Sequence, residues 1–200
     1  MQKQKDNSTL AKKVSLRKSA LKEIDHPVIM ETHGGNGKIF ERCYQSCLSG
    51  IVFEKDSVKA NLLSQQRPTW SVYEGDSISA LESGIGSHLE INFLDIDPYG
   101  SPWDVIDAFL FSDRPFAKTL HIVVNDGLRQ KVQINSSTVK QLQGIVQKYG
   151  EKLYPNYLEV SQVLMDEKAS KAGYVLTRWA GYYCGHGNNM THYWAVLDKR

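Results

Sequence analysis

Short apolar runs alternate with longer helical patterns between residues 28 and 150, and this alternation restricts the fold more than any other feature of the sequence. The runs read as buried strands and lie at residues 28–31, 50–56, 70–76, 89–98 and 119–127. A pattern with helical spacing follows each run, at residues 38–48, 57–66, 77–84, 102–111 and 138–150. Five strand–helix units in succession predict a parallel sheet with helices on both faces.

The C-terminal part of the chain has a different pattern. Residues 174–185 and 190–198 are aromatic and alternate as strands do, with only the turn-like residues 186–189 between them. Strands joined so directly must pair antiparallel, because a parallel return needs a crossover of a dozen or more residues. We therefore predict an α/β fold with a seven-stranded, mostly parallel sheet that ends in an antiparallel hairpin.

Charge is nearly balanced over the chain but not at its N-terminus. The 200 residues suit one domain, and 24 basic against 22 acidic residues give a net charge of +2, so the whole protein has no general attraction to nucleic acid. Residues 1–22 are locally basic, with one acid, Asp6, against Lys3, Lys5, Lys12, Lys13, Arg17, Lys18 and Lys22. We expect residues 1–24 to form a basic tail with a short helix over 15–24, before a single catalytic domain at 25–200. The tail is either a basic arm beside a phosphate backbone or a solvated terminus.

The cysteines and the hydropathy indicate a cytoplasmic protein. Cys43, Cys47 and Cys184 are an odd number, and no other Cys or His stands at ligand spacing beside the first two. We therefore expect reduced, partly buried thiols and no metal site. No apolar run approaches the ~18 residues of a membrane span, and the first residues lack the apolar core of a secretion signal.

A glycine-rich stretch, residues 31–37 (ETHGGNG), separates the first strand from the first helix. Glycines are wanted where the backbone turns sharply and approaches a ligand closely. The spacing is not that of a dinucleotide-binding turn, because Phe40 stands where the last glycine would be. Instead, acids follow three successive strands, Glu31, Glu54 and Asp76, which places them at one edge of the sheet. A glycine-rich turn that binds no ligand is the alternative.

This set resembles the first motifs of class I S-adenosylmethionine-dependent methyltransferases, whose fold is Rossmann-like. The resemblance implies that Gly35 and Gly37 let the methionine end of S-adenosylmethionine lie against the backbone, that Glu54 holds the ribose hydroxyls and that Asp76 meets the adenine amino group. His33 departs from the family pattern and either covers the methyl-transfer region or packs the loop. The residues assigned to the cofactor are Glu31, His33, Gly35, Gly37, Glu54, Lys55, Asp76, Ser77 and Asp95.

The fourth strand ends in the sequence DIDPYGSP, residues 95–102. The exocyclic amino group of a base is a poor nucleophile, and a carboxylate and a carbonyl that accept its hydrogens direct its lone pair, while an aromatic ring stacks on the base. The stretch is similar to D/N-P-P-Y/F of nucleic-acid amino methyltransferases and, more closely, to D-P-F/Y-G-S-P of the tRNA guanine N2-dimethyltransferase family. By this resemblance Asp97 accepts from the substrate amino group, Pro98 supplies the carbonyl and Tyr99 stacks. The alternative is an acidic turn that caps the next helix.

The sequence thus predicts a methyltransferase for an exocyclic amino group of DNA or RNA. The alternatives are a methyltransferase for a protein or small molecule and a non-catalytic subunit of the same fold; a partner subunit or a homodimer is left open. Arg129 and Lys131 after the fifth strand are candidate phosphate contacts. Most hairpin aromatics are expected to pack on the sheet, although a base or phosphate surface is the other reading of Arg178, Trp179, Tyr182, Tyr183, His186, His192, Tyr193 and Trp194.

Overall fold

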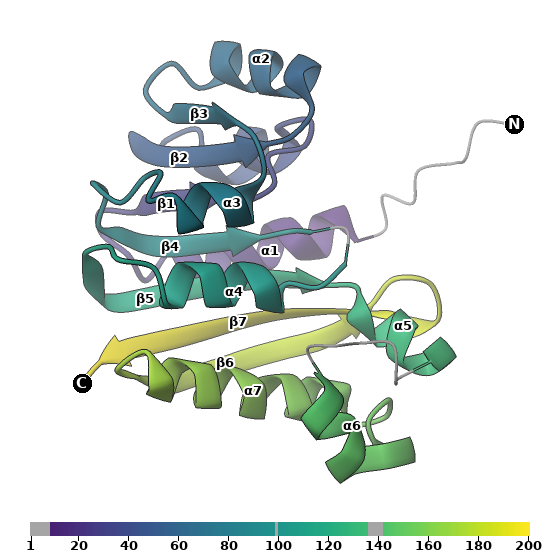
Figure 1. Cartoon of the computed structure of the whole chain (residues 1–200). Coiled ribbons are helices and arrows are strands. Elements are labelled where there is room, and N and C mark those ends of the chain that lie inside the picture. The colour runs from purple at the N-terminus through teal and green to yellow at the C-terminus, as the bar shows by residue number, and fades with distance from the viewer. Residues whose placement is uncertain (1–8, 99, 136–141) are drawn as a thin grey trace, which may run out of the picture.

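The computed structural model describes residues 9–98, 100–135 and 142–200, which form one seven-stranded sheet (Figure 1). The strands are β1 (Val28–Glu31), β2 (Ser49–Glu54), β3 (Ser71–Glu74), β4 (Ile91–Ile96), β5 (Phe116–Asp126), β6 (Tyr174–Cys184) and β7 (Met190–Lys199). Their spatial order is β3-β2-β1-β4-β5-β7-β6. β1 to β5 pair in parallel, whereas β7 is antiparallel to both β5 and β6. The predicted fold class is confirmed.

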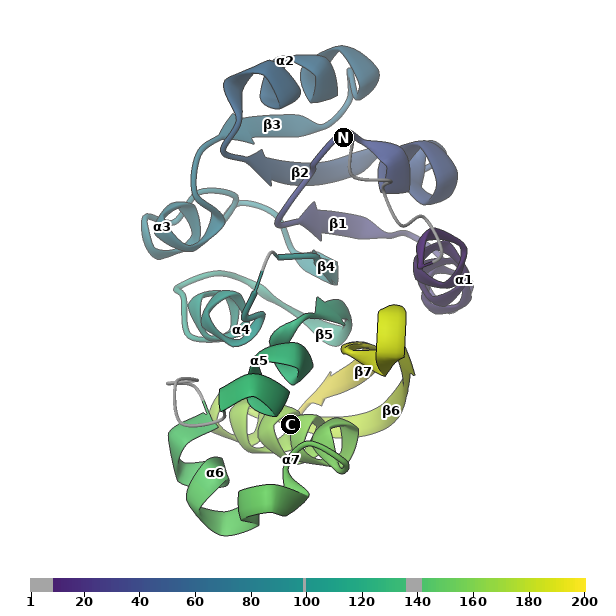
Figure 2. The ribbon, with the colours of Figure 1, turned by 90° about the vertical axis from the view of Figure 1, so that its right-hand side faces the viewer.

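Helices cover both faces of the sheet (Figure 2). They are α1 (Leu10–Leu21), α2 (Ser57–Gln66), α3 (Ser77–Glu82), α4 (Trp103–Leu110), α5 (Leu128–Asn135), α6 (Gln143–Tyr149) and α7 (Tyr157–Lys171), with the short 3₁₀ helices η4 (Gly150–Lys152) and η5 (His186–Asn188). Part of the helix predicted at 138–150 lies outside the described residues, and α6 lies within the remainder. Among the described residues, no helix is both long and apolar enough to cross a membrane.

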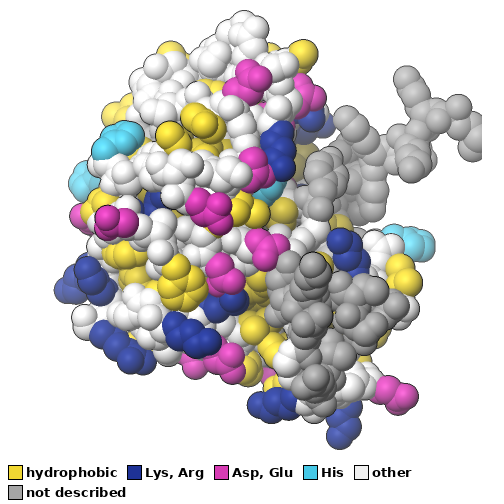
Figure 3. Space-filling view, in the orientation of Figure 1, with side chains coloured by type: hydrophobic (Ala, Val, Ile, Leu, Met, Phe, Trp, Pro, Cys, Tyr) yellow, Lys and Arg dark blue, Asp and Glu magenta, His cyan; other side chains and the backbone are white. Residues whose placement is uncertain are grey.

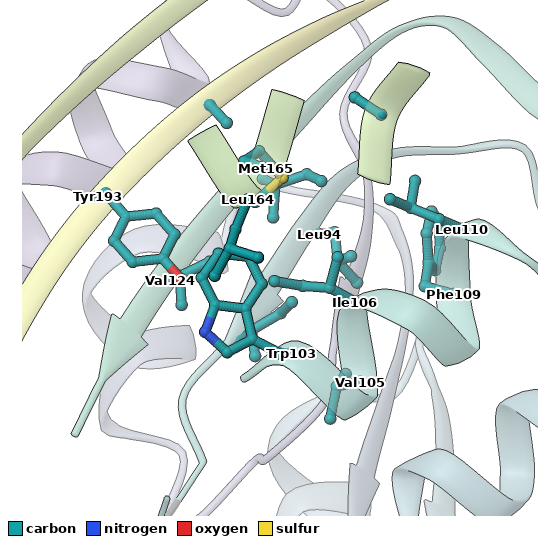
Figure 4. Packing of buried hydrophobic residues seen from close by; sticks show 14 of the residues in the cluster. Leu94, Trp103, Val105, Ile106, Phe109, Leu110, Val124, Leu164, Met165 and Tyr193 are labelled. Carbon is teal, nitrogen blue, oxygen red and sulfur yellow. The ribbon is translucent and has the colours of Figure 1, made fainter. Parts of the chain in front are cut away.

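Alternation along the strands divides the core into two apolar clusters. Successive strand residues point to opposite faces, so Phe93 of β4 packs on the α1 side while Leu94 packs beneath α4 and α7. Figure 4 shows Leu94 beside Ile106 and Trp103 in the second cluster. The alternation also sets the direction of the Asp95 side chain. Asp95 lies two residues after Phe93 and therefore faces α1.

Three local predictions needed correction. The helix expected over 15–24 runs from Leu10 to Leu21. The helix expected over 38–48 contains a π-helix, η1 (Phe40–Tyr44), whose wider turn buries Phe40 and Tyr44 against the sheet. The prediction assigned no helix directly after the fifth strand or within residues 151–173, yet α5 lies in the first place and α7, which packs on β6, lies in the second. The cysteines are free, with Cys47 and Cys184 buried and Cys43 partly so, as expected.

Candidate functional site

A cavity of about 670 Å³ opens at the carboxyl ends of the parallel strands. This is the edge where open α/β sheets bind ligands, and the volume falls within the usual range of ligand pockets. Most residues predicted for the site line it, namely Glu31, His33, Gly35, Glu54, Lys55, Ser77, Asp97 and Pro98. Gly37, Asp76 and Asp95 do not line it, and Tyr99 lies outside the described residues.

The glycine loop follows β1 and is held against the end of β2. The N–H of Gly34 donates to the Phe53 carbonyl at 2.9 Å, and that of Gly35 donates to Glu54 Oε2 at 2.7 Å. Gly35 and Gly37 have φ values of +54° and +73°, which side chains rarely tolerate. A Cβ built on Gly35 would meet no protein atom within 4 Å. The loop therefore leaves backbone open to the cavity where a ligand can approach it.

Glu54 ends β2 and orients two segments of the cavity wall. Its Oε2 accepts from Gly35 and its Oε1 accepts from the Asp56 N–H at 3.0 Å. Each carboxylate oxygen has a second lone pair, so the group retains capacity for two further hydrogen-bond donors. A pair of neighbouring hydroxyls is one partner that would use this capacity.

Asp76 follows β3 and caps α3, accepting from the Ser79 N–H at 2.9 Å. Its carboxylate also pairs with Lys55 Nζ at 2.5 Å. The hydrogen bond from Lys55 is the main cause that lowers the pKa of Asp76, and the Ser79 N–H adds to it. Gly75 and Ser77, the residues on either side of Asp76, line the cavity. The segment around Asp76 therefore reaches the cavity wall, while the carboxylate itself ties β2 to α3.

Glu31 forms a buried ion pair that the sequence did not reveal. The Arg67 guanidinium, just after α2, donates to Glu31 and lies over the Phe40 and Trp70 rings, 4.3 and 5.3 Å from their centroids. Burial raises the pKa of Glu31 to about 7, although Arg67 opposes the change. Among the described residues, Nε and Nη2 of Arg67 have no hydrogen-bond partner. The Glu31 carboxylate thus serves first to anchor the end of α2 beneath the glycine loop.

Asp95 is also engaged within the protein and is only 1% exposed. Arg17 of α1 donates to both carboxylate oxygens, from Nε at 2.8 Å and from Nη2 at 2.5 Å. Tyr44 of η1 donates its hydroxyl at 2.6 Å. Since these donors fix the carboxylate, Asp95 joins α1, η1 and β4 behind the cavity. Arg17 itself is fully buried.

Asp97 lies on the cavity wall beyond the end of β4. Its two oxygens accept from Lys13 Nζ at 2.8 and 2.9 Å, and its side chain is 27% exposed. Burial by itself would raise the pKa of Asp97, but the charges of Lys13 and Arg17 outweigh it and lower the pKa. Pro98 lines the cavity next to it. Asp97 is therefore an ionised acceptor, and the group it binds in this structure is an ammonium.

His33 belongs to the glycine loop and lines the cavity. The Nδ1 atom of its ring is 2.9 Å from Thr32 Oγ1, and burial lowers its pKa. Thr32 in turn donates its N–H to the Asp95 carbonyl at 3.0 Å. His33 thus lines the cavity as a neutral ring, in a loop fixed to both β2 and β4.

Most of the hairpin residues named in the sequence analysis pack within the protein, as expected from their strand pattern. Tyr193 and His192 are fully buried, and Trp179 stacks on Tyr193 with the ring centroids 4.6 Å apart. Arg129, a candidate phosphate contact, is buried instead; it donates to the Asn188 carbonyl and lies 3.9 Å from the Tyr154 ring centroid. Arg129 lies at the carboxyl end of β5, as expected, but its guanidinium is taken up by contacts within the protein, whereas Lys131 is exposed.

Lys13, Arg17 and Arg67 are the site residues that sequence reasoning missed. Lys13 and Arg17 are four residues apart and share a helix face with Leu16 and Ala20, which are buried. Cations on the apolar face of a helix are candidates for buried ion pairs. The sequence therefore did contain a signal for Lys13 and Arg17. We find no comparable signal for Arg67.

Comparison with known proteins identifies the fold. No family model and no curated protein matches the sequence. Among solved structures, Trm1 from Pyrococcus horikoshii in complex with S-adenosyl-L-methionine is similar, with a TM-score of 0.71 at 13% identity. The chain shares its fold with this protein. The match covers 96% of this chain but only 55% of the Trm1 chain, so this chain spans about half the length of that relative.

Two further structures support the same fold. TYW2 from M. jannaschii in complex with AdoMet has a TM-score of 0.59 at 9% identity, over 100% of this chain and 80% of its own. The N-methyltransferase NodS from Bradyrhizobium japonicum WM9 has a TM-score of 0.64 at 9% identity, over 98% of this chain and 99% of its own. At such identities the likeness establishes architecture, and the activity must be argued from the site.

Proposed function

We propose that this chain is an S-adenosylmethionine-dependent methyltransferase that modifies an exocyclic amino group of a base in DNA or RNA. The observation that carries the proposal is the ionised Asp97 carboxylate on the cavity wall, which holds a nitrogen donor at 2.8 and 2.9 Å. It lies in one cavity with the open backbone of Gly35 and with Glu54. A carboxylate that can accept from an amine, beside a ligand cradle, is what amino-group methylation requires.

The residues present fit S-adenosylmethionine. The open position above Gly35 leaves room for the methionine end, and Glu54 has free lone pairs for the ribose hydroxyls. Lys55 and Ser77 line the wall where the adenine would lie, with Asp76 beside them. When bound, the cofactor supplies a methyl group on a sulfonium. Glu31 holds the loop through Arg67 rather than by meeting the ligand first.

On the acceptor side, Asp97 acts as hydrogen-bond acceptor and then as proton acceptor for the amino group. Its lowered pKa keeps it ionised, so its oxygens can accept from the amino group in the place where they accept from Lys13 in this structure. Accepting one hydrogen directs the nitrogen lone pair away from the ring of the base, and the Pro98 carbonyl accepts the second. Stacking by Tyr99 completes the proposed set. His33, with its lowered pKa, presents a neutral ring toward the cavity and adds no charge that would repel a sulfonium.

A methyltransferase for a non-nucleic-acid amine is the second candidate. It is favoured by the likeness to NodS, an N-methyltransferase, over nearly the whole of both chains. In that case Asp97 has the same role toward a different amine.

The test is transfer of a labelled methyl group from S-adenosylmethionine to tRNA, total RNA, single-stranded DNA and duplex DNA, followed by nucleoside analysis. We expect label on an exocyclic amino group of one of these, and none with Asp97→Ala. Methylation confined to ring nitrogens, carbons or ribose would contradict the proposal. Label on small amines alone would support the second candidate.

A further inference from the structure

An ammonium from α1 occupies the place beside Asp97 on the cavity wall. Lys13 Nζ contacts both carboxylate oxygens, and its side chain is only 17% exposed. Lys13 and Asp97 both line the cavity, together with Leu10 and Met190. The amino group of the proposed acceptor must bind the same Asp97 carboxylate. The two amines therefore compete for one carboxylate.

Spare hydrogen-bonding groups lie in the same layer of the sheet. Asp97 follows Ile96, which pairs with Val124, so Asp97 is level with Asn125 of β5, and Asn125 pairs with His192 of β7. Asn125 is 1% exposed and His192 is fully buried. Within the described residues, Oδ1 of Asn125 and Nε2 of His192 have no hydrogen-bond partner, whereas the Asn125 side chain is close enough to Asp97 to help lower the pKa of that carboxyl group. Buried polar groups normally have a partner, so these two residues leave hydrogen-bonding capacity unused in the layer of Asp97, although neither of them lines the cavity.

The N-terminal half of α1 covers this layer. Tyr182 of β6 donates its hydroxyl to the Lys12 carbonyl at 2.9 Å, and the same hydroxyl lies 3.1 Å from His192 Nδ1. Further along α1, the buried Arg17–Asp95 pair fixes the helix to β4. The helix is thus anchored at Arg17, and its first turn is held near Asp97 by Lys13, by the hydrogen bond to Tyr182 and by the packing of Leu10 on the apolar cluster.

We propose that Lys13 selects acceptors that carry both an amino group and a phosphate, because it gives up Asp97 only when the phosphate takes up its ammonium. The proposal rests on the proposed function and names the substrate class of that site. A neutral acceptor would have to separate a partly buried ion pair and leave the ammonium without a partner, which is costly. A phosphate beside the amino group replaces the lost carboxylate. Lys13 then positions the acceptor, and Asp97 receives the amino group.

Titratable groups from α1, from the loop after β1 and from β7 act on Asp97. α1 contributes Lys13 and Arg17, and Arg17 already pairs with Asp95 of β4. The loop after β1 contributes His33 and β7 contributes His192; burial lowers the pKa of both, to about 3 for His192, so both are neutral near pH 7. Lys13 is therefore the cation whose removal changes Asp97 most.

The first experiment measures the pKa of Asp97 by carboxyl carbon NMR, assigned with Asp97→Asn. Lys13→Met should raise the pKa by about 1 to 3 pH units, because the opposite charge is lost. Lys13→Arg should keep it low. Lys18→Met is the matched control, since it removes the same charge from an exposed position of α1, and it should change nothing. If Lys13→Met does not fold, Lys13→Gln replaces it. An unchanged Asp97 pKa in both would overturn the proposal.

The second experiment adds a ligand that carries phosphate groups. A mixed-sequence single-stranded oligonucleotide should raise the Asp97 pKa of the wild-type protein and leave that of Lys13→Met nearly unchanged. The salt dependence of oligonucleotide binding should weaken by about 0.7 in slope for Lys13→Met, one phosphate contact on a single strand, and not for Lys18→Met. A nucleoside monophosphate run in parallel distinguishes a free nucleotide from a polymer as the source of the phosphate.

The outcomes separate the two proposals. If neither phosphate ligand raises the wild-type Asp97 pKa, or if Lys13→Met keeps the wild-type salt slope, Lys13 does not transfer to phosphate and the inference fails. Neither measurement needs methyl transfer. A protein that shows both effects but never transfers a methyl group would contradict the proposed function and leave the phosphate-dependent release of Lys13 standing.

Discussion

The two halves of the cavity are built in different ways. On the cofactor half, the partners are close in sequence: Gly35 and Glu54 are 19 residues apart, and Asp76 caps the helix that it precedes. On the acceptor half, around Asp97, they are distant: 84 residues separate Lys13 from Asp97, and 78 separate Arg17 from Asp95 in the ion pair behind the cavity. The first half is therefore fixed by turns and strand ends, and the second depends on docking α1 against the sheet.

This difference in sequence separation determines which contacts can be predicted from the sequence. A glycine loop and a strand-end acid form a local pattern, whose geometry follows from the strand–turn–helix unit that contains it. The pKa of Asp97 depends on Lys13 of α1, which lies 84 residues earlier in the chain. We expect the following variants to affect the two halves differently, and Asp126, which is buried outside the cavity lining, tests the pH dependence of stability.

Asp97→Ala should lower kcat by about 10² to 10⁴-fold, the range expected when a positioned proton acceptor is removed. Affinity for S-adenosylmethionine should stay within a few-fold, because Asp97 acts on the acceptor. Single-turnover methylation and calorimetric titration measure the two effects separately. If the variant lost cofactor binding as well, the division of the cavity into two halves would be wrong.

Arg17→Met should lower the free energy of unfolding by about 3 to 5 kcal/mol, because it leaves the buried Asp95 carboxylate without its cation. Urea denaturation measures it. Arg178→Met is the control, since Arg178 pairs with Glu23 at an exposed position and its loss should cost at most about 1 kcal/mol. Equal effects of the two variants would show that α1 is not anchored through Arg17.

Asp126→Asn should change how stability depends on pH. Burial raises the pKa of Asp126 to about 7, whereas an unfolded Asp titrates near ~3.9. The folded state therefore holds this proton more tightly, and its stabilising contribution, complete below pH ~4, is lost as the pH rises to about 7. Across that range the wild type should lose on the order of 3 kcal/mol relative to the variant. Urea denaturation at several pH values measures the difference, and a constant difference would refute a neutral Asp126.

Glu54→Gln should weaken S-adenosylmethionine binding by about 10- to 100-fold, because hydrogen bonds to a charged acceptor contribute about 1.5 to 3 kcal/mol. Glu74→Gln, at the exposed end of β3, should bind as the wild type does. Calorimetric titration gives both affinities. Wild-type affinity in Glu54→Gln would remove Glu54 from the cofactor half.

Lys55→Met should have the smallest effect, at most about 1 kcal/mol on the free energy of unfolding, since the pair with Asp76 is largely exposed. The effect should shrink further in 0.5 M salt, which screens exposed pairs (Debye length roughly 10 Å at 0.1 M and shorter above it). A loss larger than that of Arg17→Met would reverse the comparison between the two halves.

The sheet and the cofactor half could be predicted because apolar periodicity and turn chemistry are local. α7 was also within reach, since Tyr157, Val160, Ser161, Leu164 and Met165 are buried at helical spacing. The π-turn at η1 was not, because its extra residue per turn depends on packing Phe40 and Tyr44 against the sheet.

The ion pairs were predicted least well. The basic N-terminal residues were expected to be solvated or to meet a phosphate backbone, yet Arg17 is buried on Asp95. Counting charges cannot distinguish these outcomes, because the packing of α1 on the sheet determines whether a basic side chain is exposed or buried in an ion pair. The position of Arg17 between Leu16 and Ala20 on one helix face was the only local indication.

The most direct test of the account is calorimetric titration of the purified protein with S-adenosylmethionine, with NAD as the control ligand. The account predicts saturable binding of S-adenosylmethionine at one site, weakened in Glu54→Gln and retained in Asp97→Ala, and no binding of NAD. Binding of NAD alone, or of neither ligand to a folded protein, would contradict it.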